Sequence, residues 1–318
     1  MSKRVLTVVT PVFNEEEVIR AFYERTKFTL DKLDDNFDSR ILFVVDRCTD
    51  NTINILKEIA AHDSSAQVLT MSARFGHQMA LLAGIDYAAD ADMIVMMDSD
   101  LQHPPELIPE LIRQHDLGND IVFTVRVDSE DVGKLRKTAG SLFYRLLGYI
   151  SKVTINENAA DFRLVSRRVA KLLRSQIRER NMFLRGLFSW IGFNQAGVEY
   201  VAAKRAAGQS KYSFSRMINL AIAGILSFST KPLKLSIFIG MGFAVLSFIL
   251  GAITVVEYFI DKTIPSGWTT IVALLLLFSG VQMIFMGVLG AYIGGIYEEI
   301  KARPHYIVDE GINIKDFE

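Results

Sequence analysis

Short apolar runs, separated by polar turns and by segments of helical periodicity, make up the first part of the chain. Runs rich in β-forming residues occupy residues 5–10, 40–46, 67–71, 93–98 and 120–125. Between them apolar residues recur at helical spacing, as they do up to about Leu33 and from Thr52 through Ile59. Alternating strands and helices predict a parallel α/β sheet, which gathers ligands at the carboxyl ends of its strands.

Two later segments have a different pattern, because apolar residues fill them almost without interruption. Residues 235–258 carry no charge before Glu257, and residues 268–297 carry none. Each segment is longer than the ~20 residues that span a bilayer core. We therefore predict two transmembrane helices, at about 235–258 and 269–296. Their many glycines predict close helix packing and a homo-oligomer, with a tetramer as one candidate order.

The segment just before the first span is amphipathic. Apolar residues recur at helical spacing from Phe214 to Phe228, opposite polar ones. We predict a helix that lies in the headgroup region, and a plain core helix is the alternative. Residues 133–152 are also basic and amphipathic, and they fit either a helix on the sheet or a membrane role.

Basic residues give the expected orientation. They precede the first span and follow the second, whereas the connecting loop offers only Lys262. The positive-inside rule then places the soluble part and the C-terminus in the cytoplasm of a multi-pass protein of the inner (plasma) membrane. The predicted organisation is a cytoplasmic domain at 1–212, an interfacial helix at 213–231, a two-span domain at 232–297 and a cytoplasmic tail at 298–318.

Composition excludes several classes of protein. The 318 residues carry a formal net charge of −1, whereas a nucleic-acid binder usually shows a strongly basic face. A single cysteine, Cys48, excludes a disulfide framework and a cysteine-rich zinc site. Residues 1–4 lack the apolar core of a signal peptide, so a secreted protein is not expected. Neither GxGxxG after the first strand nor GxxxxGK[ST] occurs, which argues against a dinucleotide fold and a P-loop.

The apolar run at 93–97 delivers two carboxylates, Asp98 and Asp100, one residue apart. Side chains at i and i+2 at an extended strand end point the same way. Both can therefore converge on Mg²⁺ or Mn²⁺, whose remaining positions take waters and substrate phosphate oxygens. A loop that only caps the next helix is the alternative.

Several motifs, in their order along the chain, resemble family 2 glycosyltransferases of the GT-A fold. More narrowly, they are similar to polyisoprenyl-phosphate glycosyltransferases, which include dolichyl-phosphate mannose synthases and bacterial bactoprenol glucosyltransferases of the GtrB type. The motifs lie at residues 10–15, 46–52, 72–77, 98–105, 161–164, 185–186 and 205–212, followed by the two spans. The resemblance implies a Rossmann-like, mostly parallel catalytic domain, an interfacial amphipathic helix and two transmembrane helices.

The resemblance also implies roles on the donor side. Pro11, Asn14 and Glu15 should line the nucleotide pocket, and Asp46 should accept a hydrogen bond from uracil. Asp98 and Asp100 should hold the metal near the diphosphate, with Asp100 counted as catalytic and Asp98 also as a contact of the nucleotide sugar. Gln102 should lie near the sugar or the metal.

One loop departs from the family pattern. The usual Asp-Asp-Gly-Ser reads Val45-Asp46-Arg47-Cys48 here, so one carboxylate and the glycine are missing. Arg47 could pair with Asp46 or with a phosphate, and both alternatives stay open. We read Cys48 as a small packing residue, and His77 and His103 as polar contacts rather than metal ligands.

On the acceptor side, the resemblance implies that Asp161 is catalytic. It could orient the acceptor or relay a proton, because a lipid phosphate is already an anionic nucleophile and needs no strong base. A structural carboxylate that caps a helix or pairs with Arg163 is the alternative. An anionic headgroup calls for a cationic site, and the candidates are Arg163, Arg185, Arg205, Ser210 and Lys211.

The expected activity is therefore a metal-dependent, inverting transfer of a hexose, with glucose from UDP-glucose as the favoured donor, to polyisoprenyl (undecaprenyl) phosphate. Transfer of another sugar, from GDP-mannose, UDP-GlcNAc or UDP-aminoarabinose, is the nearest alternative. A non-catalytic, membrane-anchored binding protein for nucleotide sugars is a third reading, favoured only by the altered loop. A processive synthase would normally carry Gln-x-x-Arg-Trp and more spans, and a nucleotidyltransferase would need no spans.

Overall fold

The computed structural model describes residues 3–127, 159–180, 182–201, 231–260 and 267–314. These residues fall into two compact units, of which the first holds a sheet and its helices and the second holds two long helices. The predicted amphipathic segments at 133–152 and 213–231 lie outside the described residues, apart from Lys231. The domain boundaries near 212 and 231 therefore stay predictions.

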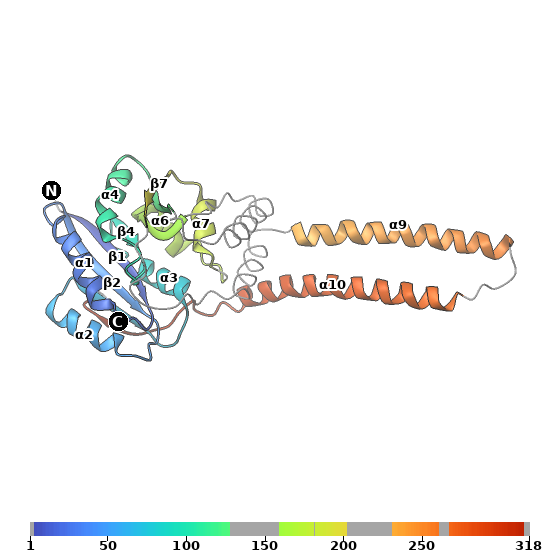
Figure 1. The fold of residues 1–318 in the computed structure, drawn as a ribbon, viewed down its shortest axis with the longest axis horizontal. Helices are drawn as coiled ribbons and strands as arrows, with labels where there is room; N and C mark the ends of the chain where they lie inside the picture. Colours follow the sequence, from blue (N-terminus) through green and yellow to red (C-terminus); the bar gives the residue numbers. More distant parts are fainter. Residues whose placement is uncertain (1–2, 128–158, 181, 202–230, 261–266, 315–318) are drawn as a thin grey trace. The chain divides into compact units, whose positions relative to one another are not determined.

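A mixed sheet runs through the described residues of the first unit (Figure 1). Its eight strands have the order β7-β5-β6-β4-β1-β2-β3-β8. They are β1 (Arg4–Val12), β2 (Phe37–Val45), β3 (Ala66–Met71), β4 (Met93–Met96), β5 (Ile121–Arg126), β6 (Ala159–Ser166), β7 (Gln195–Tyr200) and β8 (Val308–Ile312). Strands β4, β1, β2 and β3 are parallel neighbours, and β5 is parallel to β7, so the predicted mostly parallel α/β fold is confirmed.

Helices follow most of the strands, as the sequence predicts. They are α1 (Ile19–Asp31), α2 (Thr52–His62), α3 (His77–Tyr87), the 3-10 turn η1 (Pro105–Leu107), α4 (Ile108–Asp116), α6 (Arg167–Ser175) and α7 (Leu184–Ile191). On one face of the sheet, Phe22 of α1 meets Phe43 of β2 edge to face, with ring centroids 6.3 Å apart. On the other face, α3 approaches so closely that a Cβ on Gly84 would lie 2.1 Å from Cγ1 of Val9.

Two antiparallel strands complete the sheet, and the sequence pattern did not predict either. β6 lies between β4 and β5 and runs against both. β8, from the C-terminal tail, runs against β3, with Val68 opposite Ile312. Asn313 anchors it, because its side-chain amide donates to the carbonyls of Ala60 at 2.7 Å and Ala66 at 3.0 Å.

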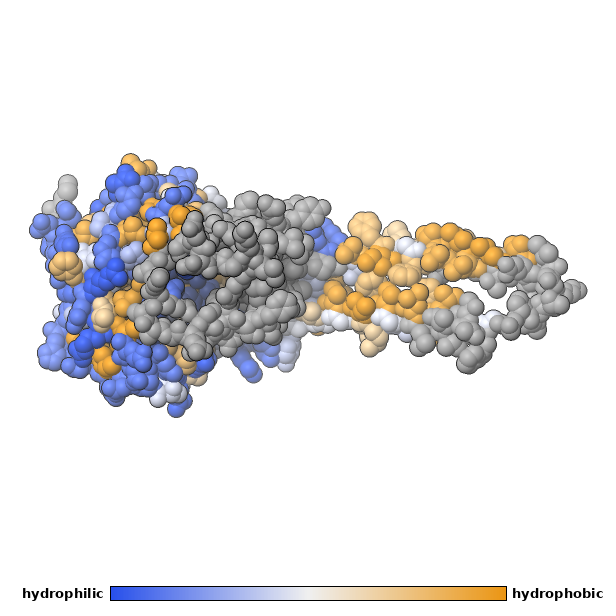
Figure 2. All heavy atoms as spheres, viewed as in Figure 1, coloured by the Kyte–Doolittle hydropathy of each residue, from blue (hydrophilic) through white to orange (hydrophobic). Residues whose placement is uncertain are grey.

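The second unit consists of α9 (Lys231–Ile260) and α10 (Trp268–Ile300). Windows within these helices, Leu233–Leu250 and Leu277–Ile300, have mean hydropathies of 2.1 and 1.6, and no part of either window is buried. At 1.5 Å per residue, the helices are about 45 and 50 Å long, enough to cross a bilayer. Phe243 contacts Phe278 with ring centroids 5.6 Å apart. Apolar side chains cover much of their visible surface, whereas the visible surface of the first unit is mostly hydrophilic (Figure 2).

Candidate active site

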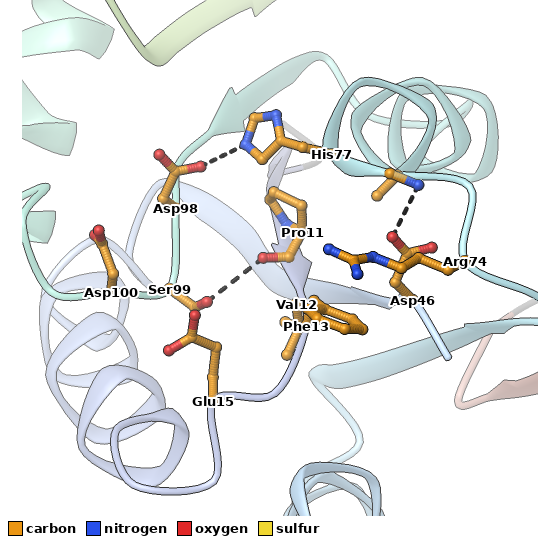
Figure 3. A pocket seen from close by; sticks show the side chains of 12 residues that line it. Pro11, Val12, Phe13, Glu15, Asp46, Arg74, His77, Asp98, Ser99 and Asp100 are labelled. Atoms are coloured by element: carbon orange, nitrogen blue, oxygen red, sulfur yellow. Dashed lines mark hydrogen bonds and ion pairs between the residues drawn. The ribbon is translucent and has the colours of Figure 1, made fainter. Parts of the chain in front are cut away.

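A cavity of about 270 Å³ opens where β1, β2 and β4 end (Figure 3). Its polar lining consists of Glu15, Asp46, Arg74, His77, Asp98, Ser99 and Asp100, and the remaining lining residues are Pro11, Val12, Phe13, Gly76 and Ala80. Most of the residues predicted to bind a nucleotide sugar or a metal thus share one cavity. Asn14 and Gln102 are not among its described lining residues.

Asp98 and Asp100 lie just past the end of β4, in a loop fixed to its neighbours. The Ser99 hydroxyl donates to the carbonyl of Pro11 at 3.4 Å, which ties the loop to β1. The amide of Gln102 donates to Oδ1 of Asp100 at 3.1 Å, across a turn in which Leu101 has a φ of 62°. Both carboxylates face the cavity, as their spacing predicts, although the strand itself ends at Met96.

Two histidines hold Asp98. Nε2 of His77 lies 2.7 Å from Oδ1 of Asp98, and the amide of Asp98 donates to Nδ1 of His103 at 3.0 Å. Burial is the largest single influence and would raise the pKa of Asp98, but the hydrogen bond from His77 and the neighbouring positive charges, that of Arg185 among them, together outweigh it and lower the pKa to about 2. Asp98 is therefore a carboxylate at neutral pH.

A divalent ion would find only part of its coordination in this protein. The described residues contain no group of three or more His, Cys, Asp or Glu side chains placed to hold a metal. Two carboxylates beside a cavity nevertheless fit Mg²⁺ or Mn²⁺, which protein sites often bind through one or two carboxylates plus substrate phosphates. The hydrogen bond from His77 would hold Asp98 in place as a metal ligand, as partners of metal-binding side chains commonly do.

Asp46 is buried at the end of β2, where it shapes the loop that leads into α3. Its two carboxylate oxygens accept hydrogen bonds from the amides of Phe75 and Gly76, each at 2.9 Å. Gly76 has a φ of 90°, a conformation that favours glycine. Each oxygen keeps a second lone pair, so the predicted contact with a base stays a prediction beside this structural one.

The altered loop after Asp46 is bound to the β1 loop. Asn14, with a φ of 55°, exchanges side-chain hydrogen bonds with Thr49, both at 2.9 Å. The backbone amide of Asn14 donates to the sulfur of Cys48 at 3.3 Å, and burial raises the pKa of that thiol. Arg47 donates to the carbonyl of Ser72 at 3.4 Å, which is neither of its two predicted partners. Asn14 and Cys48 thus join two loops.

A cluster of charged groups lies at β6 and α7, and it contains three of the residues predicted for the acceptor side: Asp161, Arg163 and Arg185. Arg185 donates to both oxygens of Asp161, from Nε at 3.2 Å and from a terminal nitrogen at 2.9 Å. Arg163 lies 3.6 Å from Asp161. Burial alone would raise the pKa of Asp161, but the charges of Arg185 and Arg163 outweigh it and lower the pKa below its ordinary value. The backbone amide of Leu184, next to Arg185, donates to Oε1 of Gln78 at 3.2 Å, and Gln78 follows His77, which lines the cavity, so the cluster lies close to the cavity.

Arg163 differs from Arg185 in accessibility. It is 3% exposed, donates to the carbonyl of Ala160 at 3.0 Å, and lies 4.7 Å from the ring centroid of Phe188. Burial lowers its pKa to about 10, which leaves it charged at neutral pH. This arrangement places Arg163 beside Asp161, and its contact with an acceptor phosphate stays a prediction. The other predicted acceptor residues, Arg205, Ser210 and Lys211, lie outside the described residues.

The sequence reasoning missed Arg74 and Phe13 as lining residues of the cavity, whereas its reading of His77 as a polar contact agrees with the hydrogen bond to Asp98. The guanidinium of Arg74 lies 3.9 Å from the ring centroid of Phe13, and both residues line the cavity. Arg74 and His77 sit between the end of β3 and the start of α3, where a parallel sheet collects ligands. Their position could have identified them.

Comparisons with known proteins give the family to which this chain belongs. A family model for glycosyl transferase family 2 matches residues 7–173. The glycosyltransferase YkcC of Bacillus subtilis (strain 168) is 40% identical over 318 residues, which are 99% of this chain and 97% of that protein. The bactoprenol glucosyl transferase of Shigella phage SfII is 39% identical over 303 residues, 95% of this chain and 97% of that protein.

Among solved structures, glucosyl-3-phosphoglycerate synthase from Mycobacterium tuberculosis is 21% identical, with a TM-score of 0.47 over 70% of this chain and 79% of that one. The family rests on the sequence matches, which span the sheet, the cavity and both apolar helices. They confirm the resemblance seen in the motifs. The chain therefore belongs to glycosyltransferase family 2, and it is a glycosyltransferase.

Proposed function

We propose that this enzyme transfers a hexose, with glucose from UDP-glucose as the favoured donor, to the phosphate of a polyisoprenyl lipid such as undecaprenyl phosphate. The observation that carries the proposal is the placement of a cation, Arg185, beside a cavity that presents Asp98 and Asp100. One side suits a metal-bound diphosphate and the other suits an anionic acceptor. The relatives named bactoprenol glucosyl transferase support this choice of acceptor and sugar.

On the donor side, Asp98 and Asp100 would hold Mg²⁺ or Mn²⁺. Such an ion supplies charge neutralisation at the leaving diphosphate. Asp46 holds the loop of Phe75 and Gly76, and this loop presents His77 and Arg74 to the same cavity. Arg74 adds a positive charge to the wall, where it can donate to a phosphate or stack against a base.

On the acceptor side, an oxygen of the lipid phosphate attacks the anomeric carbon as the bond from that carbon to the UDP oxygen breaks. The configuration inverts because the displacement is single. A phosphate monoester with a second pKa near ~6 is mostly dianionic at neutral pH, so no proton must be removed. Asp161 is a weak base because its pKa is lowered, and we assign it to orienting Arg185.

The proposed acceptor is a membrane lipid, and α9 and α10 are long and apolar enough to anchor the enzyme in the membrane that contains this lipid. We propose that both helices span the inner (plasma) membrane, with the soluble unit and the C-terminus on the cytoplasmic side. Six basic residues lie between 204 and 234, before the first span, whereas the loop between the spans offers Lys262. The glycines of both helices suit assembly into a homo-oligomer.

The test uses purified full-length protein in detergent, with undecaprenyl phosphate and a panel of UDP- and GDP-sugars, each with and without Mg²⁺ or Mn²⁺. Mass spectrometry of the lipid fraction identifies the product. We expect a metal-dependent monophosphate-linked glycosyl lipid from UDP-glucose. A product from a different donor would replace the sugar in the proposal, and the absence of any glycosyl lipid would overturn the choice of acceptor.

A further inference from the structure

A second cavity, of about 300 Å³, lies between α3 and α6 and shares no lining residue with the first. Three cationic side chains of α6 line it: Arg167, Lys171 and Arg174. Its remaining wall is apolar and includes Ile85, Ala89 and Ala170. A cationic rim over an apolar floor suits an anionic group that is attached to a hydrocarbon.

Two of these cations are available for a ligand. Arg167 is held at the mouth, where it donates to the carbonyls of Asp90 and Ala91 and lies 3.5 Å from Asp92. Lys171 and Arg174 are exposed and have no side-chain partner among the described residues. The carboxylates nearby are already engaged, because Asp90 pairs with Arg40 at 2.7 Å and Asp92 accepts from the amide of Val5 at 2.8 Å. The cavity therefore has a positive charge that the described part of the protein leaves unbalanced.

The cavity is also linked to the tail that emerges from the apolar helices. Arg178 continues the spacing of Arg167, Lys171 and Arg174, and it pairs with Asp86 of α3 at 2.9 Å. The hydroxyl of Tyr306 donates to the same Asp86 at 2.6 Å. Tyr306 is only six residues past Ile300, the end of α10, so the intervening chain can span at most about 20 Å. The row of basic residues from Arg167 to Arg178 thus ends at Asp86, to which Tyr306 of the tail also donates.

We propose that this cavity binds the headgroup phosphate of an anionic bilayer phospholipid, with Lys171 and Arg174 on the phosphate and the apolar floor beneath the start of its hydrocarbon. The site is separate from the one that takes the acceptor lipid, and it rests on the membrane association proposed above. Bound there, a phospholipid orients the soluble unit on the bilayer without taking part in glycosyl transfer.

The test measures how fast the amine of Lys171 is acylated, by peptide mass spectrometry, in the full-length enzyme reconstituted in nanodiscs. One preparation contains phosphatidylglycerol and the other only phosphatidylcholine. A cation near an anionic bilayer surface gains enough to predict about fivefold slower acylation of Lys171 with phosphatidylglycerol. Lys32, whose Nζ lies over the ring of Phe28 on α1, is the internal control and should react equally in both. Equal rates for Lys171 in the two preparations would overturn the proposal.

Two further arms separate this site from its alternatives. Inorganic phosphate added to phosphatidylcholine nanodiscs should not protect Lys171, and protection there would assign the cavity to a free phosphate instead. Arg174→Ala should abolish the protection of Lys171, whereas Arg168→Ala should keep it, because Arg168 of the same helix stacks on Phe193 at 4.0 Å and pairs with Asp120. Equal protection in both variants would contradict the proposed site. Glycosyl transfer measured on the same nanodiscs reports separately on the proposed function.

Discussion

Arg185 donates hydrogen bonds to both carboxylate oxygens of Asp161, at 3.2 and 2.9 Å. Asp161 is the residue that the family resemblance marks as catalytic, so both oxygens of that carboxylate are already engaged. A carboxylate held by a planar guanidinium fork gains orientation and loses basicity. In the proposed mechanism, Asp161 would therefore orient Arg185, and Arg185 would supply the positive charge for the acceptor phosphate.

Replacing Asp161 by Asn should lower kcat/KM for the lipid acceptor by about 10- to 100-fold, the range expected when a charged hydrogen bond is lost. The loss should fall mainly on the acceptor KM, because the donor cavity is left intact. Arg185→Lys, which keeps the charge but not the fork, should show a similar loss. A double variant should then add little, and additive losses would contradict a shared role.

The pH dependence distinguishes positioning from base catalysis. Because the pKa of Asp161 is lowered below the ordinary value of ~3.9, Asp161 is ionised across pH 6–9 in the folded enzyme. Its contribution to stability is present above the unfolded-state pKa and is lost as the pH falls through the lower, folded-state value. The pH–rate profiles of the native enzyme and of Asp161→Asn should therefore have the same shape between pH 6 and 9. A limb that disappears in the variant would identify Asp161 as a base.

His77 should affect metal binding through Asp98. His77→Ala removes the 2.7 Å hydrogen bond that orients this carboxylate, and the loss of such a partner typically weakens metal affinity by about 10- to 100-fold. The measurement is a Mn²⁺ titration followed by electron paramagnetic resonance, together with the metal dependence of activity. His62→Ala, at an exposed position that ends α2, is the control and should change neither. An unaltered Mn²⁺ affinity in His77→Ala would show that the histidine does not support the site.

Asp46 should matter for stability as well as for donor binding. In Asp46→Asn, one of the amides of Phe75 and Gly76 would face an NH₂ group, which leaves a buried donor unsatisfied at a cost of about 1–3 kcal/mol in free energy of unfolding. We expect a lower melting temperature and faster hydrogen exchange at residues 75–77. Arg47→Ala, in the same loop, should leave both unchanged. If Asp46→Asn lost only affinity for the nucleotide sugar and kept its stability, the role of Asp46 would be confined to binding the nucleobase.

Asn313 offers a test of the attachment of the C-terminal strand. Asn313→Gly loses the hydrogen bonds to the carbonyls of Ala60 and Ala66, and Asn313→Ala loses the same bonds. Only alanine also strains the backbone, because position 313 has a φ of 58°. The alanine variant should therefore be less stable than the glycine variant by about 1 kcal/mol in denaturant unfolding of the soluble unit. Equal stabilities would mean that this turn relaxes.

Local patterns were sufficient to predict the parallel core and the pair of carboxylates, Asp98 and Asp100, that lines the cavity, whereas the other donor-side residues came from the family resemblance. The runs at 5–10, 40–46, 67–71 and 93–98 are apolar and β-rich, so their periodicity and the chemistry at their ends could be read directly. Asp98 and Asp100 were found because their spacing carries information that does not depend on the rest of the fold.

Long-range partners could not be read in this way. β8 is short and half polar, and only its pairing with β3 makes it a strand. Arg163 is buried, and Arg185 is hydrogen-bonded to Asp161, because β6 packs against α7. The spacing of residues in the sequence does not indicate how close these two elements lie. His77 lies 21 residues before Asp98, so its hydrogen bond appears only in the folded chain.

The position of β8 sets an order of events during synthesis. This strand is made last, after both apolar helices, yet it belongs to the sheet that begins at residue 4. On the ribosome, the outer side of β3 stays unpaired until residues 308–312 emerge. A product that stops before the helices would therefore also lack β8, the C-terminal strand of the described sheet. Completion of the sheet thus requires that α9 and α10 have already been synthesised, so the sheet cannot be finished in a product that lacks the two apolar helices.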